Sequence, residues 1–337
     1  MALIAMWGMD DTAGETGLAI SNGQLLTTGR GITGGCWNSQ NFGQNDMTLT
    51  FPTAPSAASF VLGFGYNNNI IGSNRAWCKI LDNASNVQFS LGFDSLGHVV
   101  LYRGNLSAAL ATSSFIAKPA VWYYMELKLV VHASAGSADL HVDGPSVVSV
   151  SGANTSTVAF TSINAVQFGG SSTSGNGQTY VDDVYLLDLT GSAPYNTYLG
   201  DVAVRSLYPS AAGDLTQWTP STGANWDAVN EVASSATDYV GASTTGLKDL
   251  YQCNDLPALT TVLAYQTWTY AAKTDAGVPP TTSAITKGDG GTTRTDSPSL
   301  PLSTTYQHLQ GPIYTTDPDG DALTLTNMNA MQVGVST

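Results

Sequence analysis

The chain has 337 residues, of which 42% are hydrophobic, only 11% are charged and 35 are glycines. This hydrophobic share excludes an intrinsically disordered chain, because it can bury enough surface to offset chain entropy. Three glutamates (Glu15, Glu126 and Glu231) are too few for a helical bundle or coiled coil. The formal charge of −14, with no basic patch, excludes electrostatic binding of nucleic acid.

The length predicts two domains of roughly 150 residues each. The apolar opening, Met1–Met9, has no basic flank and continues into Asp10-Asp11, so we expect no signal peptide and synthesis in a cytoplasm. No apolar run approaches the ~20 residues of a membrane helix, so we expect no membrane insertion.

Strand patterns begin at Phe60–Tyr66, an apolar segment with Gly63 and Gly65 inside it. Glycines in a strand interior predict that something packs close to the backbone. Val87–Phe93 alternates in polarity, and His98–Arg103 returns after a turn. This pattern predicts an antiparallel hairpin.

The strongest strand signal is Trp122–His132, which alternates with a period of two. Tyr123, Met125, Leu127, Leu129 and Val131 are predicted to face the core, and Tyr124, Glu126, Lys128 and His132 to face solvent. Ala138–Asp143 then alternates in the same way before a turn at Gly144. Many short strands separated by turns predict a β-sandwich over residues 1–193.

Residues 194–337 predict a second, less regular β-rich module for attachment or oligomerisation. Strand-like pieces include Asp201–Leu207 and Thr260–Tyr270. Residues 275–303 are rich in Gly, Pro, Ser and Thr, which predicts a long loop or extended arm that drapes over a neighbour.

Val121–Leu127, a turn and Asp139–Gly144 resemble the concanavalin A-like or laminin-G-like jelly roll. Tyr180–Leu186 is similar to the closing strand of that fold. The resemblance implies an all-β protein: a jelly-roll sandwich over residues 1–193, followed by the less regular β-rich module.

Three segments resemble structural proteins of tailed bacteriophages that begin with this jelly roll. They are the opening from Leu3 to Asp11, the strand Phe60–Gly65, and the ending Thr316-Asp317-Pro318 with Asn329–Val335. Where such endings often carry a tryptophan after Asp-Pro, this chain has Asp-Gly-Asp and then Leu323. The resemblance implies a virion protein with other virion proteins as partners, and a homo-oligomer, most often a trimer.

Two groups of acidic residues are candidate metal ligands. Asp182 and Asp183 are neighbours in a predicted strand, so they should point to opposite faces and cannot form a glycosidase pair. Asp317, Asp319 and Asp321 begin like an EF-hand, but the spacing of Gly320 and Met328 excludes that loop. We expect no cofactor, apart from a looser calcium site left open at either place against the alternative of solvated acidic turns.

Exposed aromatic side chains stack on sugars and anchor protein interfaces. Most aromatics should lie in the core, and Tyr124 is the clearest exception because alternation places it on the polar face. Trp37 and Trp77 join it as candidates for surface or glycan contact.

We find no catalytic set in the sequence and predict that the chain is not an enzyme, with no hydrolysis of polysaccharide. The favoured function is a tail-associated appendage, of the fibre or receptor-binding type, that contacts a host-surface glycan or receptor. The alternative is a capsid decoration, cement or head-fibre protein, and a glycan-cleaving enzyme is a distant third. In the favoured arrangement residues 1–190 face outward and residues 194–337 attach to the particle.

Overall fold

A computed structural model describes residues 3–10, 18–20, 24–31, 34–39, 46–71, 75–169, 178–258, 261–274, 281–296 and 300–337. The chain divides into two compact units, Met1–Arg205 and Ser206–Thr337. No helix in the described part of the chain is long and apolar enough to cross a membrane.

The first unit consists of short antiparallel strands and one 3-10 turn. Its elements are β1 (Leu3–Trp7), β2 (Leu18–Ile20), β3 (Gln24–Leu26), β4 (Cys36–Asn38), β5 (Met47–Thr50), η1 (Ser56–Ala58), β6 (Ser59–Asn68), β7 (Arg75–Asp82), β8 (Val87–Phe93), β9 (His98–Arg103), β10 (Ala108–Ile116), β11 (Tyr123–Val130), β12 (Gly136–Val142), β13 (Ser146–Ala153), β14 (Ile163–Phe168) and β15 (Thr179–Leu187).

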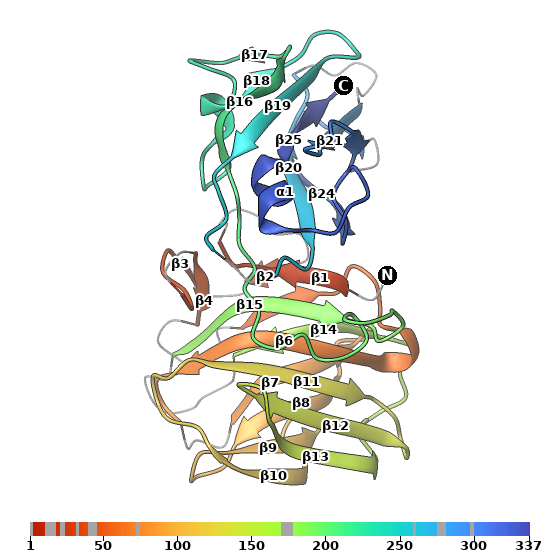
Figure 1. The fold of residues 1–337 in the computed structure, drawn as a ribbon. Helices are drawn as coiled ribbons and strands as arrows, with labels where there is room; N and C mark the ends of the chain where they lie inside the picture. Colours follow the sequence, from red (N-terminus) through yellow and green to blue (C-terminus); the bar gives the residue numbers. More distant parts are fainter. Residues whose placement is uncertain are drawn as a thin grey trace. The chain divides into compact units, whose positions relative to one another are not determined.

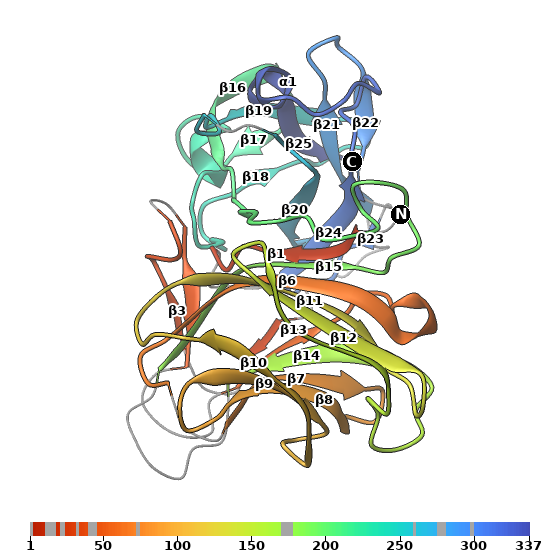
Figure 2. The same cartoon turned by 60° about the horizontal axis from the view of Figure 1, so that its bottom comes forward.

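These strands form two sheets packed face to face (Figures 1 and 2). One has the order β13-β12-β11-β6-β15-β4-β3, with β1 also paired to β15, and the other has the order β10-β9-β8-β7-β14-β5-β2. All recorded pairings are antiparallel, and the chain crosses between the sheets several times, as in a jelly roll. The predicted all-β fold with an N-terminal sandwich is confirmed.

One continuous apolar core fills the space between the two sheets. Its aromatic centre stacks Trp77 on Tyr66, with ring centroids 4.3 Å apart, and on Phe93, at 5.3 Å. Trp77 is 2% exposed and Trp37 is 0% exposed. The prediction that these two tryptophans contact a surface ligand is therefore wrong, because their strands turn them into the sandwich.

The outer face of the first sheet confirms the close packing predicted at Gly63 and Gly65. A Cβ on Gly63 would lie 2.0 Å from the Tyr185 ring, and one on Gly65 would lie 2.8 Å from the Arg30 side chain. The two glycines thus leave room on β6 for a tyrosine ring and an arginine stem.

Residues 199–205, here called the strap, are bound to this outer face. The Glu126 carboxylate accepts the Gly200 N–H at 2.9 Å, and Asp183 accepts the Val204 N–H at 2.7 Å. Arg30 donates to the Val202 carbonyl at 2.6 Å. These bonds correct two predictions: the first unit extends beyond residue 193, and Asp201–Leu207 is not a strand.

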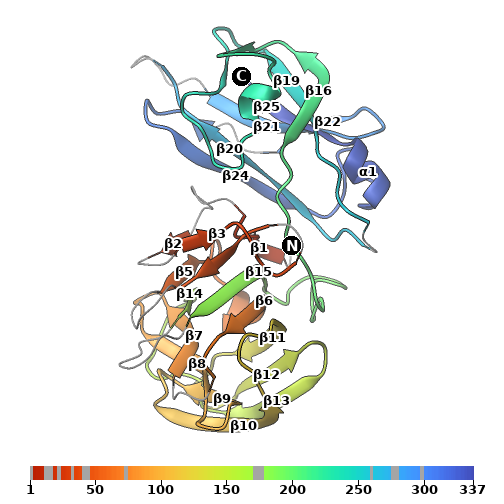
Figure 3. The same cartoon turned by 90° about the vertical axis from the view of Figure 1, so that its left-hand side faces the viewer.

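The second unit contains shorter and less regular elements (Figure 3). They are β16 (Pro209–Thr216), β17 (Thr219–Pro220), η2 (Asp227–Val229), β18 (Val240–Gly241), β19 (Lys248–Cys253), β20 (Tyr265–Ala271), β21 (Thr281–Lys287), β22 (Thr293–Thr295), β23 (Leu300–Pro301), β24 (Gln307–Tyr314), α1 (Leu325–Ala330) and β25 (Gln332–Ser336). A sheet of order β16-β19-β25-β21-β22 forms its framework, and β20 and β24 pair as a separate two-stranded ribbon.

The predicted arm over residues 275–303 is largely wrong. Thr281–Lys287 forms β21, of which residues 283–287 pair with β25 and residues 281–282 with β23, and Ala284 and Ile285 are 3% and 1% exposed. Residues 275–280 and 297–299 lie outside the described residues. The flanking Gly and Pro residues suggested a loop, whereas the β-branched run between them is a buried strand.

Two glycines in strands of the second unit give a matched test of the packing. A Cβ on Gly334 would lie 1.8 Å from the Asp249 carbonyl oxygen, whereas one on Gly241 would meet only the Tyr239 ring at 3.9 Å. We expect Gly334→Ala to lower the free energy of unfolding by about 1–3 kcal/mol, because a backbone atom cannot move aside. Gly241→Ala should change it by less than about 1 kcal/mol. Urea denaturation measures both, and equal effects would contradict the packing described.

Candidate functional site

Asp182 and Asp183 lie at a β-bulge where β15 crosses β6. Asp182 pairs with Gly65 and Tyr185 with Gly63, so β15 has one residue more than its partner between these points. Val181 and Val184 on either side belong to the core, and Asp183 has a φ of 51°. The bulge turns both carboxylates to the outer face, so the prediction of opposite faces is wrong.

Arg30 lies between these carboxylates and the strap. Its guanidinium contacts Asp183 Oδ2 through Nε at 3.1 Å and through Nη2 at 2.9 Å, and its backbone N–H donates to Asp182 Oδ2 at 2.6 Å. Arg30 therefore supplies the positive charge that a metal ion would bring. Arg30 and Asp183 thus form an ion pair at this place, and the metal site at Asp182 and Asp183 stays a prediction.

Tyr124 also belongs to this cluster and is only 3% exposed, so its predicted exposure is wrong. The Arg30 guanidinium lies 4.7 Å from its ring centroid, and its hydroxyl donates to the Asp183 carbonyl at 3.2 Å. The alternation of β11 was interpreted correctly, but Arg30 covers the outer face of the strand at this position.

Burial, and then repulsion from the Asp183 carboxylate, raise the pKa of Asp182 to about 8. Burial also raises the pKa of Asp183, opposed by the Val204 N–H and by Arg30. An ordinary aspartate titrates near about pH 3.9. The cluster therefore holds a proton in the folded chain at pH values where the unfolded chain has lost it.

Because the folded chain holds this proton near Asp182, its free energy of unfolding depends on pH. Between about pH 4 and the folded pKa of about 8, the contribution of Asp182 to the free energy of unfolding falls as pH rises. Asp182→Asn cannot titrate, so the stability advantage of the wild type over this variant should shrink between about pH 5 and about pH 8. Urea denaturation at several pH values measures it.

The matched control for this measurement is Asp201→Asn. It removes a carboxylate that is 62% exposed and binds the same arginine, and we expect a difference that does not change over the same pH range. A wild-type advantage over Asp182→Asn that stays constant or grows with pH would contradict the assignment.

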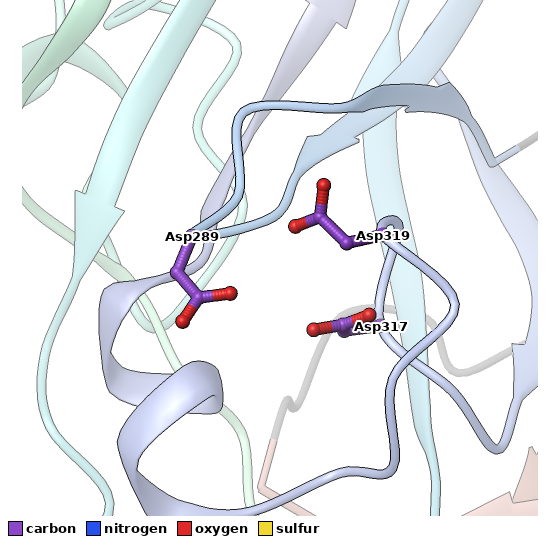
Figure 4. Close-up of side chains that lie close together, drawn as sticks. All are labelled: Asp289, Asp317 and Asp319. Carbon is purple, nitrogen blue, oxygen red and sulfur yellow. The ribbon is translucent and has the colours of Figure 1, made fainter.

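A second acidic cluster lies in the second unit (Figure 4). Carboxylate oxygens of Asp289, Asp317 and Asp319 all lie within 4.8 Å of one another. Asp289 is in the turn between β21 and β22, and the other two are in the loop between β24 and α1. The structure thus brings Asp317 and Asp319 together, as predicted, but Asp321 is not a member of this group.

Hydrogen bonds show what these carboxylates do within the chain. Asp319 accepts the N–H groups of Gly290 and Thr292, each at 2.9 Å. The Thr292 side chain and then these N–H groups lower the pKa of Asp319. Asp317 is 1% exposed and accepts the Asp321 N–H at 2.8 Å and the Asn327 side-chain amide at 3.1 Å. These two aspartates join the hairpin turn to the loop before α1.

Three carboxylates are a partial ligand set for a cation such as calcium, which takes six to eight oxygen ligands. Sequence reasoning missed Asp289 because it lies in a different hairpin from Asp317. The Gly-Asp-Gly-Gly turn at residues 288–291 was the available signal, but nothing in the sequence shows which loop such a turn will meet.

The buried and exposed members of this cluster should differ in their effect on stability. Asp317→Ala leaves two donors without an acceptor, so we expect the free energy of unfolding to fall by about 1–3 kcal/mol. Asp289→Ala removes an exposed side chain and should change it by no more than about 0.5 kcal/mol. Thermal or urea denaturation compares them, and a harmless Asp317→Ala would show that the loop does not depend on this carboxylate.

No protein-family model matches the sequence, and no curated protein matches it. Solved structures that resemble it include a sialidase (12% identity, TM-score 0.36, 50% of this chain and 17% of that chain). Others are the binding domain of Paraclostridial Mosquitocidal Protein 1 (10%, 0.40, 56% and 49%) and an endo-beta-1,4-glucuronan lyase from the fungus Trichoderma reesei (11%, 0.38, 52% and 89%).

The chain spans 17%, 42% and 49% of the first three matched structures. With TM-scores of 0.36, 0.38 and 0.40, these likenesses assign no activity to this chain. The all-β fold stands on the strand pairings described above.

The prediction that the chain is not an enzyme is corrected: the matched structures include a sialidase and an endo-beta-1,4-glucuronan lyase, which assign no activity to this chain and give no ground for excluding one. Part of its physical basis has also failed. The sequence argument placed Asp182 and Asp183 on opposite faces, and the bulge places both on the same one. That argument therefore cannot exclude catalysis.

Proposed function

We propose that the chain is a structural protein of a tailed-bacteriophage particle, made in the host cytoplasm, that forms part of a tail appendage and contacts the host surface. One observation carries the proposal: two of the segments that resemble phage structural proteins include most of a central strand, β6 in the first unit and β25 in the second. A resemblance confined to surface loops would say little about the fold.

In the first unit, Phe60–Gly65 lies within β6, which pairs with β11 on one side and β15 on the other. In the second unit, Asn329–Val335 includes most of β25, which pairs with β19 and β21. Thr316-Asp317-Pro318 forms the loop that Asp317 fixes to α1. The resemblance therefore involves the central strands of two separate sheets.

A jelly roll suits host contact because its loops gather at the ends of a rigid scaffold. The predicted homotrimer remains a consequence of the resemblance alone. Its second argument, a free arm at residues 275–303, is lost because residues 283–287 pair with β25 of the same unit.

Localisation in the particle tests the proposal. We expect an antibody against the chain to label the tail of purified particles, and mass spectrometry to detect the chain in them. Particles lacking the chain should assemble and adsorb poorly to the host. Label spread over the head, with normal adsorption of the deleted particle, would contradict the tail assignment and favour the capsid decoration alternative.

A further inference from the structure

Strands β20 and β24 pair as a two-stranded ribbon (Figure 3). Aromatic side chains follow one face of this ribbon. Trp268 pairs with Gln310 and Tyr270 pairs with His308, and directly paired residues share a face of the ribbon. Burial along β20 agrees, because Tyr265 and Thr267 are buried, whereas Trp268 and Tyr270 are half-buried. The ribbon therefore has one packed face and one open face.

The open face gathers rings from three segments. Tyr270 stacks on Tyr306 with centroids 4.8 Å apart and an interplanar angle of 20°, and lies 4.5 Å from His308. Tyr239 is 42% exposed. Burial, and then the neighbouring Tyr239 and Tyr270, raise the pKa of Tyr306. We call Tyr239, Trp268, Tyr270, Tyr306 and His308 the aromatic strip.

The polar ends of these side chains are available to a ligand. Within the described ranges, no residue hydrogen-bonds to the Trp268 indole N–H or to the hydroxyls of Tyr239, Tyr270 and Tyr306. The polar atoms of the half-buried Trp268, Tyr270 and Tyr306 are not buried. On the same face Gln310 donates to the side chain of Gln266 at 2.9 Å, so two amides flank the rings.

The strands that carry the aromatic strip contain no formally charged residue. Residues 261–271 and 300–314 contain no Asp, Glu, Lys or Arg. A charged ligand would find no counter-ion on the ribbon, whereas an uncharged ligand with many hydroxyls would find ring faces, donors and acceptors together.

We propose that the aromatic strip binds neutral pyranose oligosaccharides. The C–H faces of a hexose pack on tyrosine and tryptophan rings, and its hydroxyls bond to the free polar ends and amides. Side chains on one face of a strand recur about every 7 Å, which is the scale of one sugar ring, so successive positions can contact successive sugars. This deepens the proposed host contact and rests on it only for the origin of the oligosaccharide.

With this proposal, the unit that is expected to contact the host changes. Outward contact is predicted from the sequence for residues 1–190, whereas the aromatic strip belongs to the second unit. Loops at the ends of the sandwich are thus the competing location for glycan contact, and a test must separate the two.

The test uses the full chain, a panel of neutral hexose oligosaccharides (gluco-, manno- and galacto-hexamers) and a charged comparison set of uronic-acid oligosaccharides, with affinity measured by calorimetry. We expect Trp268→Ala and Tyr306→Ala to weaken binding by about tenfold or more, as for other aromatic anchors. Tyr306→Phe should retain most of the stacking. The matched control is Trp122→Ala, a half-buried tryptophan of the first unit that contacts Tyr180 and should leave affinity unchanged.

Each remaining outcome is decisive. If binding survives both strip variants, or is lost in Trp122→Ala, the binding site is not the aromatic strip. The proposed host contact is then not contradicted. Binding only to charged glycans overturns the proposed ligand class. A strip variant that changes the sedimentation coefficient shows that a second copy of the chain covers the strip, which also overturns the proposal. Absence of binding to any glycan contradicts both the strip and glycan-mediated host contact.

Discussion

The ion pair between Arg30 and Asp183 is the interaction on which the outer face of the first sheet depends. Asp183, Asp182 and Glu126 are each no more than 4% exposed, and a buried carboxylate without partners is strongly destabilising. Arg30 neutralises the first of them, and backbone N–H groups of the strap satisfy Asp183 and Glu126. The bulge in β15, the glycines of β6 and the course of residues 199–205 all serve this arrangement.

The second unit also contains buried aspartates whose charge is balanced by hydrogen-bond donors or by an arginine. Asp249 is 0% exposed and accepts the N–H of Trp218 at 2.7 Å and the Tyr251 hydroxyl at 3.0 Å. Asp296, also 0% exposed, pairs with Arg294, whose guanidinium lies 3.6 Å from the centre of the Tyr314 ring. Buried aspartates thus fix loops to strands in both units, and this explains why acidic residues that resemble metal ligands in the sequence are so often structural.

The alternation of β11 and β12, and the glycines of β6, were enough to predict the sandwich, because a period of two and a close backbone approach are local properties. The burial of Tyr124 was not predictable, because the residue that covers it, Arg30, lies 94 residues away in the sequence. The bulge at Asp182 was also hidden, because one extra residue in a strand leaves no mark on composition. The proximity of Asp289 to Asp317 was not predictable either, because tertiary folding brings their two loops together. The strand β21 was missed because its Gly and Pro flanks outweighed its β-branched residues.

The strap limits where this chain can exchange parts with another during evolution. A crossover at residue 193 would pass on a sandwich with the Glu126 and Asp183 carboxylates but without the backbone N–H groups of Gly200 and Val204 that satisfy them. A crossover after residue 205 would transmit carboxylates and donors together. Natural mosaics that share only the first unit should therefore begin to diverge after the strap, even though the last strand of the sandwich ends at Leu187.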